Sequence, residues 1–194
     1  LAGAQGRDWP ERLANAMSAW EGAFSLIVLA SDGVYALRDP WGFRPLSTGR
    51  LPDGGMAAAS ESSALRVLGC AEIREVRPGE IVRLGPAGLE AFPGVEPRAR
   101  ASCSFEYIYF SRPDGDWNGR SIHAVRRRLG EILAEESPAE ADAVIPVPDS
   151  AIASAIGYAA RSGLPYDEGF VKNRYIGRTF IEPTEALRRQ GVAL

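Results

Sequence analysis

The chain has 194 residues, of which 45% are hydrophobic and 24% are charged. Its formal net charge of -3 argues against a general nucleic-acid binder, because such proteins are normally made basic by their binding face. No apolar run reaches about 18 residues and no signal-peptide pattern is present, so the sequence predicts no membrane span.

The first half of the chain predicts antiparallel sheet with helices laid against it. Apolar residues at helical spacing predict a helix over residues 11–20. Two apolar runs, 23–30 and 33–37, are joined by two residues and predict a β-hairpin. A second helix is expected over 61–68, with Ser60 as its N-cap. The other predicted strands are 56–59, 73–76, 80–84 and 89–92.

The second half has a different pattern. Residues 93–101 are rich in Pro, Gly and Arg and lack periodicity, so they predict a domain junction. An amphipathic helix over 121–136 follows. Predicted strands at 143–147 and 166–171 then flank a helix of small residues at 151–160. This order of helix, strand, turn, helix and strand is the opening of a doubly wound α/β domain.

Asp149 and Ser150 end the predicted strand at 143–147 and precede a helix. In open α/β sheets, ligands bind outside the carboxyl ends of the strands. A carboxylate and a hydroxyl at that place suit a Mg²⁺ ion and the phosphate oxygens around it. In the alternative interpretation Ser150 caps the following helix and Asp149 fills the turn.

The segment 169–183 begins in the last residues of the next predicted strand, 166–171, and contains Lys172, the only lysine of the chain. Arg174 and Arg178 lie close to it, and Gly177 supplies a joint where the backbone can move. Lysine and arginine both bind phosphate oxygens, so this composition predicts a loop that closes over a polyanion. A solvated basic turn is the alternative. Its place after the Asp149 turn favours a phosphate site.

The two cysteines are far apart and predict no disulfide framework, so a reducing cytoplasm is the expected compartment. From the residues alone, Cys103 and Cys70 are small packing residues. His123, the only histidine, has no partner in the sequence that would make it a general base. The sequence contains no GxSxG, CxxC, HExxH or Walker motif.

Five phrases, taken together and in order, resemble the amidophosphoribosyltransferase family. They are Arg38–Leu46 (RDPWGFRPL), Ala59–Ser62, Cys103–Asp114, Pro146–Ser150 and Phe170–Ile181. The first phrase alone is typical of the wider class II glutamine amidotransferases. The Cys103 phrase is similar to the iron–sulfur-containing branch of the family.

The resemblance implies two domains. Residues 1–92 would be the C-terminal part of an α+β Ntn-hydrolase-type sandwich, the glutaminase domain. Residues 93–102 would be the junction, and 103–194 the front part of an α/β phosphoribosyltransferase type I domain. The implied glycosyltransferase forms 5-phosphoribosylamine from phosphoribosyl pyrophosphate, glutamine and water, releasing glutamate and pyrophosphate. This is the first step of de novo purine biosynthesis, and ammonia passes between the domains through a channel.

The same resemblance implies site residues. Ser150 matches a position of the Mg²⁺ site, and Cys103 matches the first of four ligands of a 4Fe–4S cluster. The segment Lys172–Ile181 matches a flexible loop that orders over the substrate and completes the channel. Tyr107 or Tyr109 is a further candidate for the channel wall. The substrate-binding residues are expected to be Lys172, Asn173, Arg174, Tyr175, Gly177, Arg178 and Thr179.

The family's N-terminal catalytic cysteine, its other three cluster cysteines and its acidic ribose-phosphate loop are not in this sequence. We therefore expect an internal fragment that has neither half-activity alone. The full-length protein is expected to be a cytoplasmic homotetramer inhibited by purine nucleotides. Two alternatives remain: a non-catalytic scaffold or regulatory module, and a phosphoribosyltransferase-like nucleotide-binding protein that would not need residues 1–92.

Overall fold

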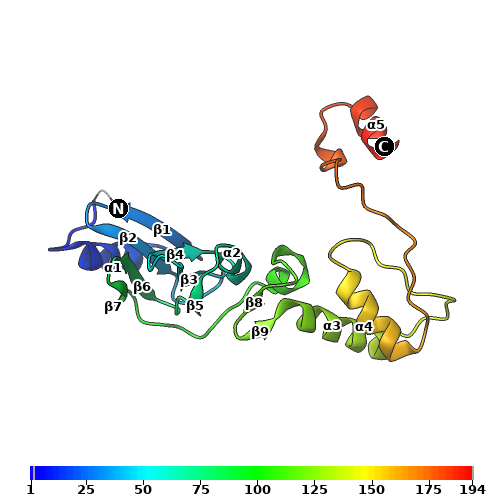
Figure 1. Cartoon of the computed structure of the whole chain (residues 1–194), viewed down its shortest axis with the longest axis horizontal. Coiled ribbons are helices and arrows are strands. Elements are labelled where there is room, and N and C mark those ends of the chain that lie inside the picture. The colour runs from blue at the N-terminus through cyan, green and yellow to red at the C-terminus, as the bar shows by residue number, and fades with distance from the viewer. Residues whose placement is uncertain (2, 194) are drawn as a thin grey trace. The chain divides into compact units, whose positions relative to one another are not determined.

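Figure 1 shows the computed structural model of the chain, which describes residues 1 and 3–193. The chain divides into two compact units, Leu1–Val125 and Arg126–Leu194. Helices and strands are mixed along the chain, so the fold is of the α+β kind. Among the described residues, no helix combines the length and the apolar character that crossing a membrane requires.

A four-stranded antiparallel sheet lies at the centre of the first unit, in the order β1-β2-β6-β7. These strands are β1 (Ser25–Ala30), β2 (Gly33–Arg38), β6 (Glu80–Gly85) and β7 (Gly88–Pro93). The predicted hairpin is confirmed, because β1 and β2 pair from Ala30 and Gly33 outward. Both faces of β2 are buried: Tyr35 and Leu37 enter one core cluster, and Ala36 between them enters another.

The first unit also contains a three-stranded sheet of order β4-β3-β5. It contains β3 (Ser47–Arg50), β4 (Met56–Ala59) and β5 (Ala71–Glu75). The sequence predicts β4 and β5 but not β3. Its residues Ser-Thr-Gly-Arg show no apolar alternation, and pairing with neighbours on both sides makes them a strand.

Helix α1 (Trp9–Ala19) starts two residues before the predicted boundary, because Asp8 caps it by accepting a hydrogen bond from the Glu11 amide at 2.9 Å. Helix α2 (Ser62–Val67) has Glu61 at its N-cap position and no side-chain cap. The predicted Ser60 cap is therefore wrong. The start of α2 is held instead by Ser62, whose Oγ accepts a hydrogen bond from the Asp116 amide at 3.0 Å.

The rest of the first unit lies beyond the predicted junction. It contains the short π-helix η1 (Glu106–Phe110) and the two-residue strands β8 (Asp116–Trp117) and β9 (Arg120–Ser121). Trp117 is buried, and its ring lies 4.8 Å from that of Tyr107. The two compact units divide after Val125. The predicted junction at 93–102 separates two families of sequence motifs and is a different kind of boundary, so it stays a prediction.

Helix α3 (Ile122–Glu136) confirms the amphipathic helix predicted over 121–136. In the second unit, α4 (Ile152–Ser162) ends at Gly163, which has φ of 78° and caps the helix in the left-handed conformation. The 3₁₀ turn η2 (Thr179–Ile181) and helix α5 (Glu185–Ala193) complete the described chain.

The strands predicted at 143–147 and 166–171 are wrong as regular strands. In the described chain they meet only in one parallel bridge, between Val144 and Tyr166. Two hydrogen bonds hold it, from Val144 N to Pro165 O at 2.8 Å and from Asp167 N to Val144 O at 3.0 Å. Pro146 and Pro148 lack the N–H donor that a longer ladder needs. The parallel direction is as expected, but a doubly wound sheet is not seen in these residues.

Candidate functional site

The structure brings the Pro-Asp-Ser turn and the basic loop together in the second unit. Lys172 Nζ lies 3.0 Å from Asp149 Oδ2, and both side chains are about half exposed (53% and 49%). The two residues are far apart in the sequence, and the bridge between Val144 and Tyr166 aligns the segments that carry them. The turn and the loop, which together predict a phosphate site, therefore lie in contact, and the phosphate site itself stays a prediction.

A small pocket of about 140 Å³ lies at this contact. Its wall combines the cations Lys172 and Arg174 with the carboxylates of Asp149 and Glu168, over the apolar side chain of Phe170. Cations next to carboxylates are what a metal–phosphate site needs, since the cations bind phosphate oxygens and the carboxylates bind the metal.

Ser150 is exposed beside Asp149. The N-cap position of α4 is Ala151, and no side chain caps this helix. The alternative in which Ser150 caps the helix is therefore wrong. Asp149 and Ser150 offer two hard oxygen ligands, which fits Mg²⁺, because this ion is usually held by one or two protein oxygens with waters and substrate phosphates.

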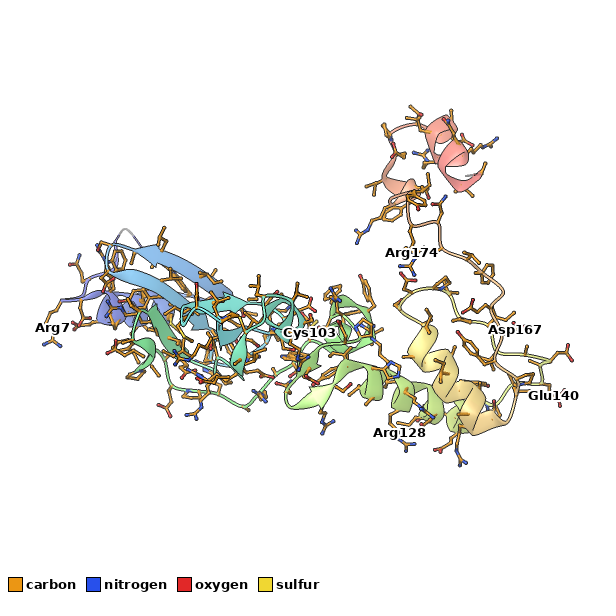
Figure 2. All side chains as sticks on the ribbon, in the orientation of Figure 1. Arg7, Cys103, Arg128, Glu140, Asp167 and Arg174 are labelled. Atoms are coloured by element: carbon orange, nitrogen blue, oxygen red, sulfur yellow. The ribbon has the colours of Figure 1, made fainter. Side chains whose placement is uncertain are left out.

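The predicted substrate-binding residues divide between two places. Lys172 and Arg174 face the Asp149 pocket, and Asn173 Oδ1 accepts a hydrogen bond from the amide of Tyr175 at 2.9 Å. The others line a second pocket of about 260 Å³ beside α5, namely Tyr175, Gly177, Arg178 and Thr179. Tyr175 is 99% exposed. Figure 2 marks Arg174 on the extended segment that leads from α4 to α5.

Cys103 and Cys70 are half-buried free thiols. Figure 2 marks Cys103, which lies just before η1. Within residues 1 and 3–193 no group of three or more His, Cys, Asp and Glu side chains is placed to hold a metal. A 4Fe–4S cluster takes four thiolates, so the described residues do not hold one by themselves. The assignment of Cys103 as one ligand stays a prediction. His123 is exposed at the start of α3.

The phrase Arg38–Leu46 folds into a loop built on two buried charged residues. Arg38 donates hydrogen bonds to the carbonyls of Arg44 (2.9 Å), Val76 (2.7 Å) and Gly42 (3.0 Å). Burial lowers the pKa of the Arg38 guanidinium, and the nearby Glu75 opposes that shift. The Asp39 carboxylate accepts from the Trp41 amide at 2.9 Å. These two residues therefore build the loop instead of meeting a ligand.

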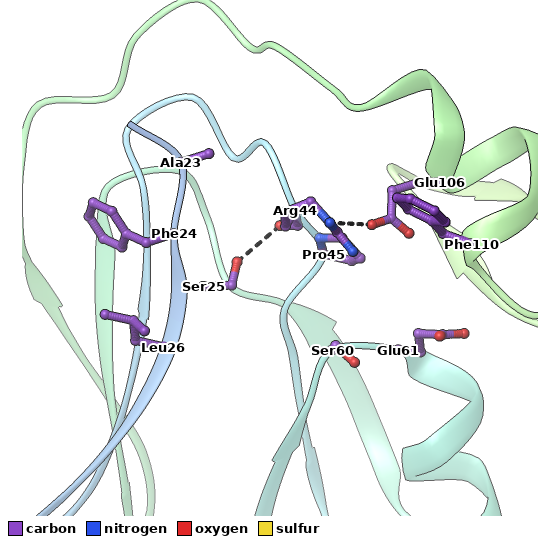
Figure 3. A pocket seen from close by; sticks show the side chains of 10 residues that line it. All are labelled: Ala23, Phe24, Ser25, Leu26, Arg44, Pro45, Ser60, Glu61, Glu106 and Phe110. Carbon is purple, nitrogen blue, oxygen red and sulfur yellow. Dashed lines mark hydrogen bonds and ion pairs between the residues drawn. The ribbon is translucent and has the colours of Figure 1, made fainter. Parts of the chain in front are cut away.

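The sequence does not single out a pocket of the first unit that has a volume of about 450 Å³ (Figure 3). Arg44 and Glu106 form an ion pair in its wall, and Phe110, Ser60 and Glu61 lie around them. Each of these residues belongs to one of the five phrases, and this membership is the only sequence feature that points to them as pocket residues. Neither their spacing nor their residue types indicate that the phrases meet.

Comparisons with known proteins complete the description. No family model matches the chain. The amidophosphoribosyltransferase of Synechococcus elongatus is 43% identical in an alignment that covers 98% of this chain and 39% of that protein. That of Bacillus subtilis is 44% identical over 95% of this chain and 38% of its own length. That of Archaeoglobus fulgidus is 49% identical over 89% and 38%. The chain thus spans about two fifths of the curated relatives that it matches.

Two solved structures have the same fold over most of the chain. The glutamine phosphoribosylpyrophosphate amidotransferase from Bacillus subtilis, complexed with ADP and GMP, superposes with a TM-score of 0.83 and 44% identity. The match covers 93% of this chain and 40% of that one. A structure described as the allosteric regulatory enzyme of purine biosynthesis gives the same TM-score and identity.

Proposed function

We propose that this chain, which is homologous along nearly its whole length to a segment of amidophosphoribosyltransferases, is part of such an enzyme. The full-length protein would form 5-phosphoribosylamine from phosphoribosyl pyrophosphate, glutamine and water, with release of glutamate and pyrophosphate. This reaction opens purine biosynthesis. The observation that best supports it is the 3.0 Å contact between Lys172 and Asp149, which joins the Pro-Asp-Ser turn to the basic loop.

The charges around that contact suit the reaction. Exchange of pyrophosphate for ammonia at C1 of the sugar develops cationic character on the ribose and negative charge on the leaving group. Lys172 and Arg174 are placed to stabilise that negative charge. Mg²⁺, when bound at Asp149 and Ser150, would supply further charge neutralisation. Closure of the loop over the substrate would keep out water that otherwise hydrolyses it.

Residues 1–92 would then be the C-terminal part of an Ntn-hydrolase-type glutaminase sandwich, and 103–194 the front part of a type I phosphoribosyltransferase domain. The two packed sheets of the first unit support the first assignment. The Bacillus subtilis structure with ADP and GMP supports purine nucleotides as ligands, and their role as inhibitors is part of the proposal. A homotetramer in the cytoplasm, a 4Fe–4S cluster and a channel lined by Tyr107 or Tyr109 belong to the same proposal.

Kinetics of Lys172→Gln in the full-length protein test the proposal at the basic loop. With ammonia as nitrogen donor, we expect kcat/KM for phosphoribosyl pyrophosphate to fall by about 100-fold, because a cation is removed from the developing charge. Arg161→Gln is the matched control, since Arg161 is an exposed residue of the same unit, paired with Glu135 at 2.7 Å. Equal kcat/KM for the two variants would contradict the assignment of the loop.

Iron analysis tests the cluster ligand. The full-length protein is expected to contain iron and acid-labile sulfide, and Cys103→Ser is expected to lose both, since each iron needs its thiolate. Cys70→Ser serves as the control because Cys70 is the other half-buried free thiol. An unchanged iron content in Cys103→Ser would exclude Cys103 as a ligand.

A further inference from the structure

Arg44 and Glu106 come from different sequence phrases and meet in the first unit, where Arg44 Nε pairs with Glu106 Oε1 (Figure 3). The first lies in the amidotransferase-type phrase Arg38–Leu46, and the second in the Cys103 phrase. The Glu106 side chain is 3% exposed and that of Arg44 is 47% exposed. The pair therefore has a buried carboxylate and joins two parts of the sequence. The proposed function assigns the part with Arg44 to the glutaminase and the part with Glu106 to the transferase.

The position of the buried Glu106 carboxylate depends on the Arg44 cation. Ser111 Oγ donates to Glu106 Oε2 at 2.8 Å, and the Arg44 guanidinium lies 5.2 Å from the ring centre of Phe110. A buried carboxylate whose cation is removed keeps its desolvation cost without the compensating charge. Arg44, by contrast, has a half-exposed side chain that water can reach. Loss of Arg44 is therefore expected to displace Glu106 and η1.

The backbone on both sides of the pair is held in register. Three amides of the segment 98–103 donate to carbonyls of the segment 40–43: Arg98 to Pro40 (2.8 Å), Ala101 to Trp41 (3.2 Å) and Cys103 to Phe43 (3.4 Å). The Arg98 guanidinium also lies 4.9 Å from the ring centre of Trp41. Because buried Arg38 fixes the Arg44 carbonyl at 2.9 Å, Arg44 projects from a rigid loop.

We propose that Arg44 is a positioning residue that couples the two activities by holding η1 through Glu106. The inference rests on the proposed function. Ammonia made by the glutaminase part has to reach the transferase part before it escapes to solvent. The two parts must therefore keep a fixed register, and small misplacements of positioned groups carry large losses. Among the described residues, two ion pairs join residues 1–92 to residues 103–194. The carboxylate of the Arg44–Glu106 pair is 3% exposed, and that of the Arg66–Asp116 pair is 44% exposed.

The test uses Glu106→Gln and Arg44→Gln in the full-length protein. Three quantities are measured: glutamine-dependent synthesis, ammonia-dependent synthesis, and glutamate released for each phosphoribosylamine formed. Glu106→Gln is nearly isosteric and retains an acceptor for Ser111, so it is expected to fold. We expect the glutamate ratio to rise about fivefold in both variants while ammonia-dependent kcat stays within about twofold. The double variant should be no worse than either single one, because one contact is lost in all three.

Arg50→Gln is the control, since Arg50 pairs at 3.2 Å with the exposed Glu72 and its loss leaves the Glu106 contact intact. A glutamate ratio in Glu106→Gln equal to that of the wild type overturns the coupling and leaves the proposed function standing. An equal fall of ammonia- and glutamine-dependent synthesis overturns it as well, since the role is then purely structural. Failure of the wild type to make phosphoribosylamine removes the proposed function, and the coupling with it.

Discussion

Within the phrase Arg38–Leu46, neighbouring charged residues have opposite roles. Arg38 and Asp39 are fully buried and bind backbone groups of the loop and, through Val76, of the strand region beside it, whereas Arg44 points into a pocket. A sequence motif does not distinguish residues that stabilise the loop from residues that contact another segment, because both are charged and both belong to the motif. Burial and partners assign Arg38 to folding and Arg44 to contact with η1.

Arg38→Met is expected to lower the free energy of unfolding by about 3–5 kcal/mol. Methionine fills similar space but leaves the carbonyls of Gly42 and Val76 buried without the Arg38 donor. It also removes the nearer of the two cations beside Glu75, the other being Arg100 at 3.6 Å. Urea denaturation followed by tryptophan fluorescence measures the change. Arg50→Met, which removes an exposed ion pair, is expected to cost less than about 1 kcal/mol. Similar losses for both variants would show that the Arg38 network contributes little.

Tyr35 predicts a pH dependence of stability. Burial, and then the hydrogen bond to Asp32 at 2.8 Å, raise its pKa from 10.0 to about 12. Between these values the unfolded chain releases the tyrosine proton while the folded chain keeps it. The contribution of Tyr35 to the free energy of unfolding is therefore complete below pH 10. Above pH 10 this contribution falls by about 1.4 kcal/mol per pH unit. Urea midpoints of wild type and Tyr35→Phe between pH 9 and 11.5 measure this. Parallel pH profiles would exclude Tyr35 as the source.

At the scale of elements, prediction succeeds where a segment determines its own structure. The β1–β2 hairpin has two apolar runs joined by two residues and α3 has strong helical periodicity, and both are found close to their predicted positions. Strand β3 has no such pattern and exists through its neighbours. The segment 143–147 has the apolar composition of a buried strand, but a parallel strand needs partners on its sides, and the described residues provide one bridge.

The candidate site likewise has a part that the sequence predicts and a part that it does not. Residue types and the order of elements predict a phosphate site at the Asp149 turn and the basic loop, and the contact of Lys172 with Asp149 agrees with that prediction. They do not predict the pairing of Arg44 with Glu106, because no local pattern encodes which loops meet across a fold. Such contacts depend on the packing of the whole unit.

Helices α3 and α4 predict a sharp response to small substitutions. A Cβ added to Gly157 would lie 2.0 Å from the Arg127 carbonyl oxygen, and one added to Gly130 would lie 1.8 Å from that of Ser154. Backbone atoms cannot move aside cheaply, so Gly157→Ala is expected to destabilise the second unit by about 1–3 kcal/mol. Thermal unfolding followed by far-UV circular dichroism measures it. Gly177→Ala, with nothing within 4 Å, is the control, and equal melting of the two variants would argue against close helix packing.

The two compact units have very different interiors. Both buried apolar clusters, which include Leu13, Tyr35 and Ile81 in one and Leu46 and Val82 in the other, belong to the first unit. Among the described residues of the second unit, the buried apolar side chains are Pro146 and four alanines, Ala134, Ala153, Ala155 and Ala159. Alanine buries little area, and hydrophobic stabilisation grows with the apolar area removed from water. The second unit is therefore expected to be the less stable of the two.

This difference predicts unfolding that depends on the probe. All four tryptophans of the chain lie in the first unit, at positions 9, 20, 41 and 117, so their fluorescence reports that unit alone. Helices α4 and α5 lie in the second unit and contribute to far-UV circular dichroism. On heating the chain, we expect ellipticity to fall in two steps and fluorescence to change only with the later one, because separate units open at different free energies. Coincident transitions would mean that the chain unfolds as one cooperative body, and the weaker interior of the second unit would then be stabilised by its continuity with the first.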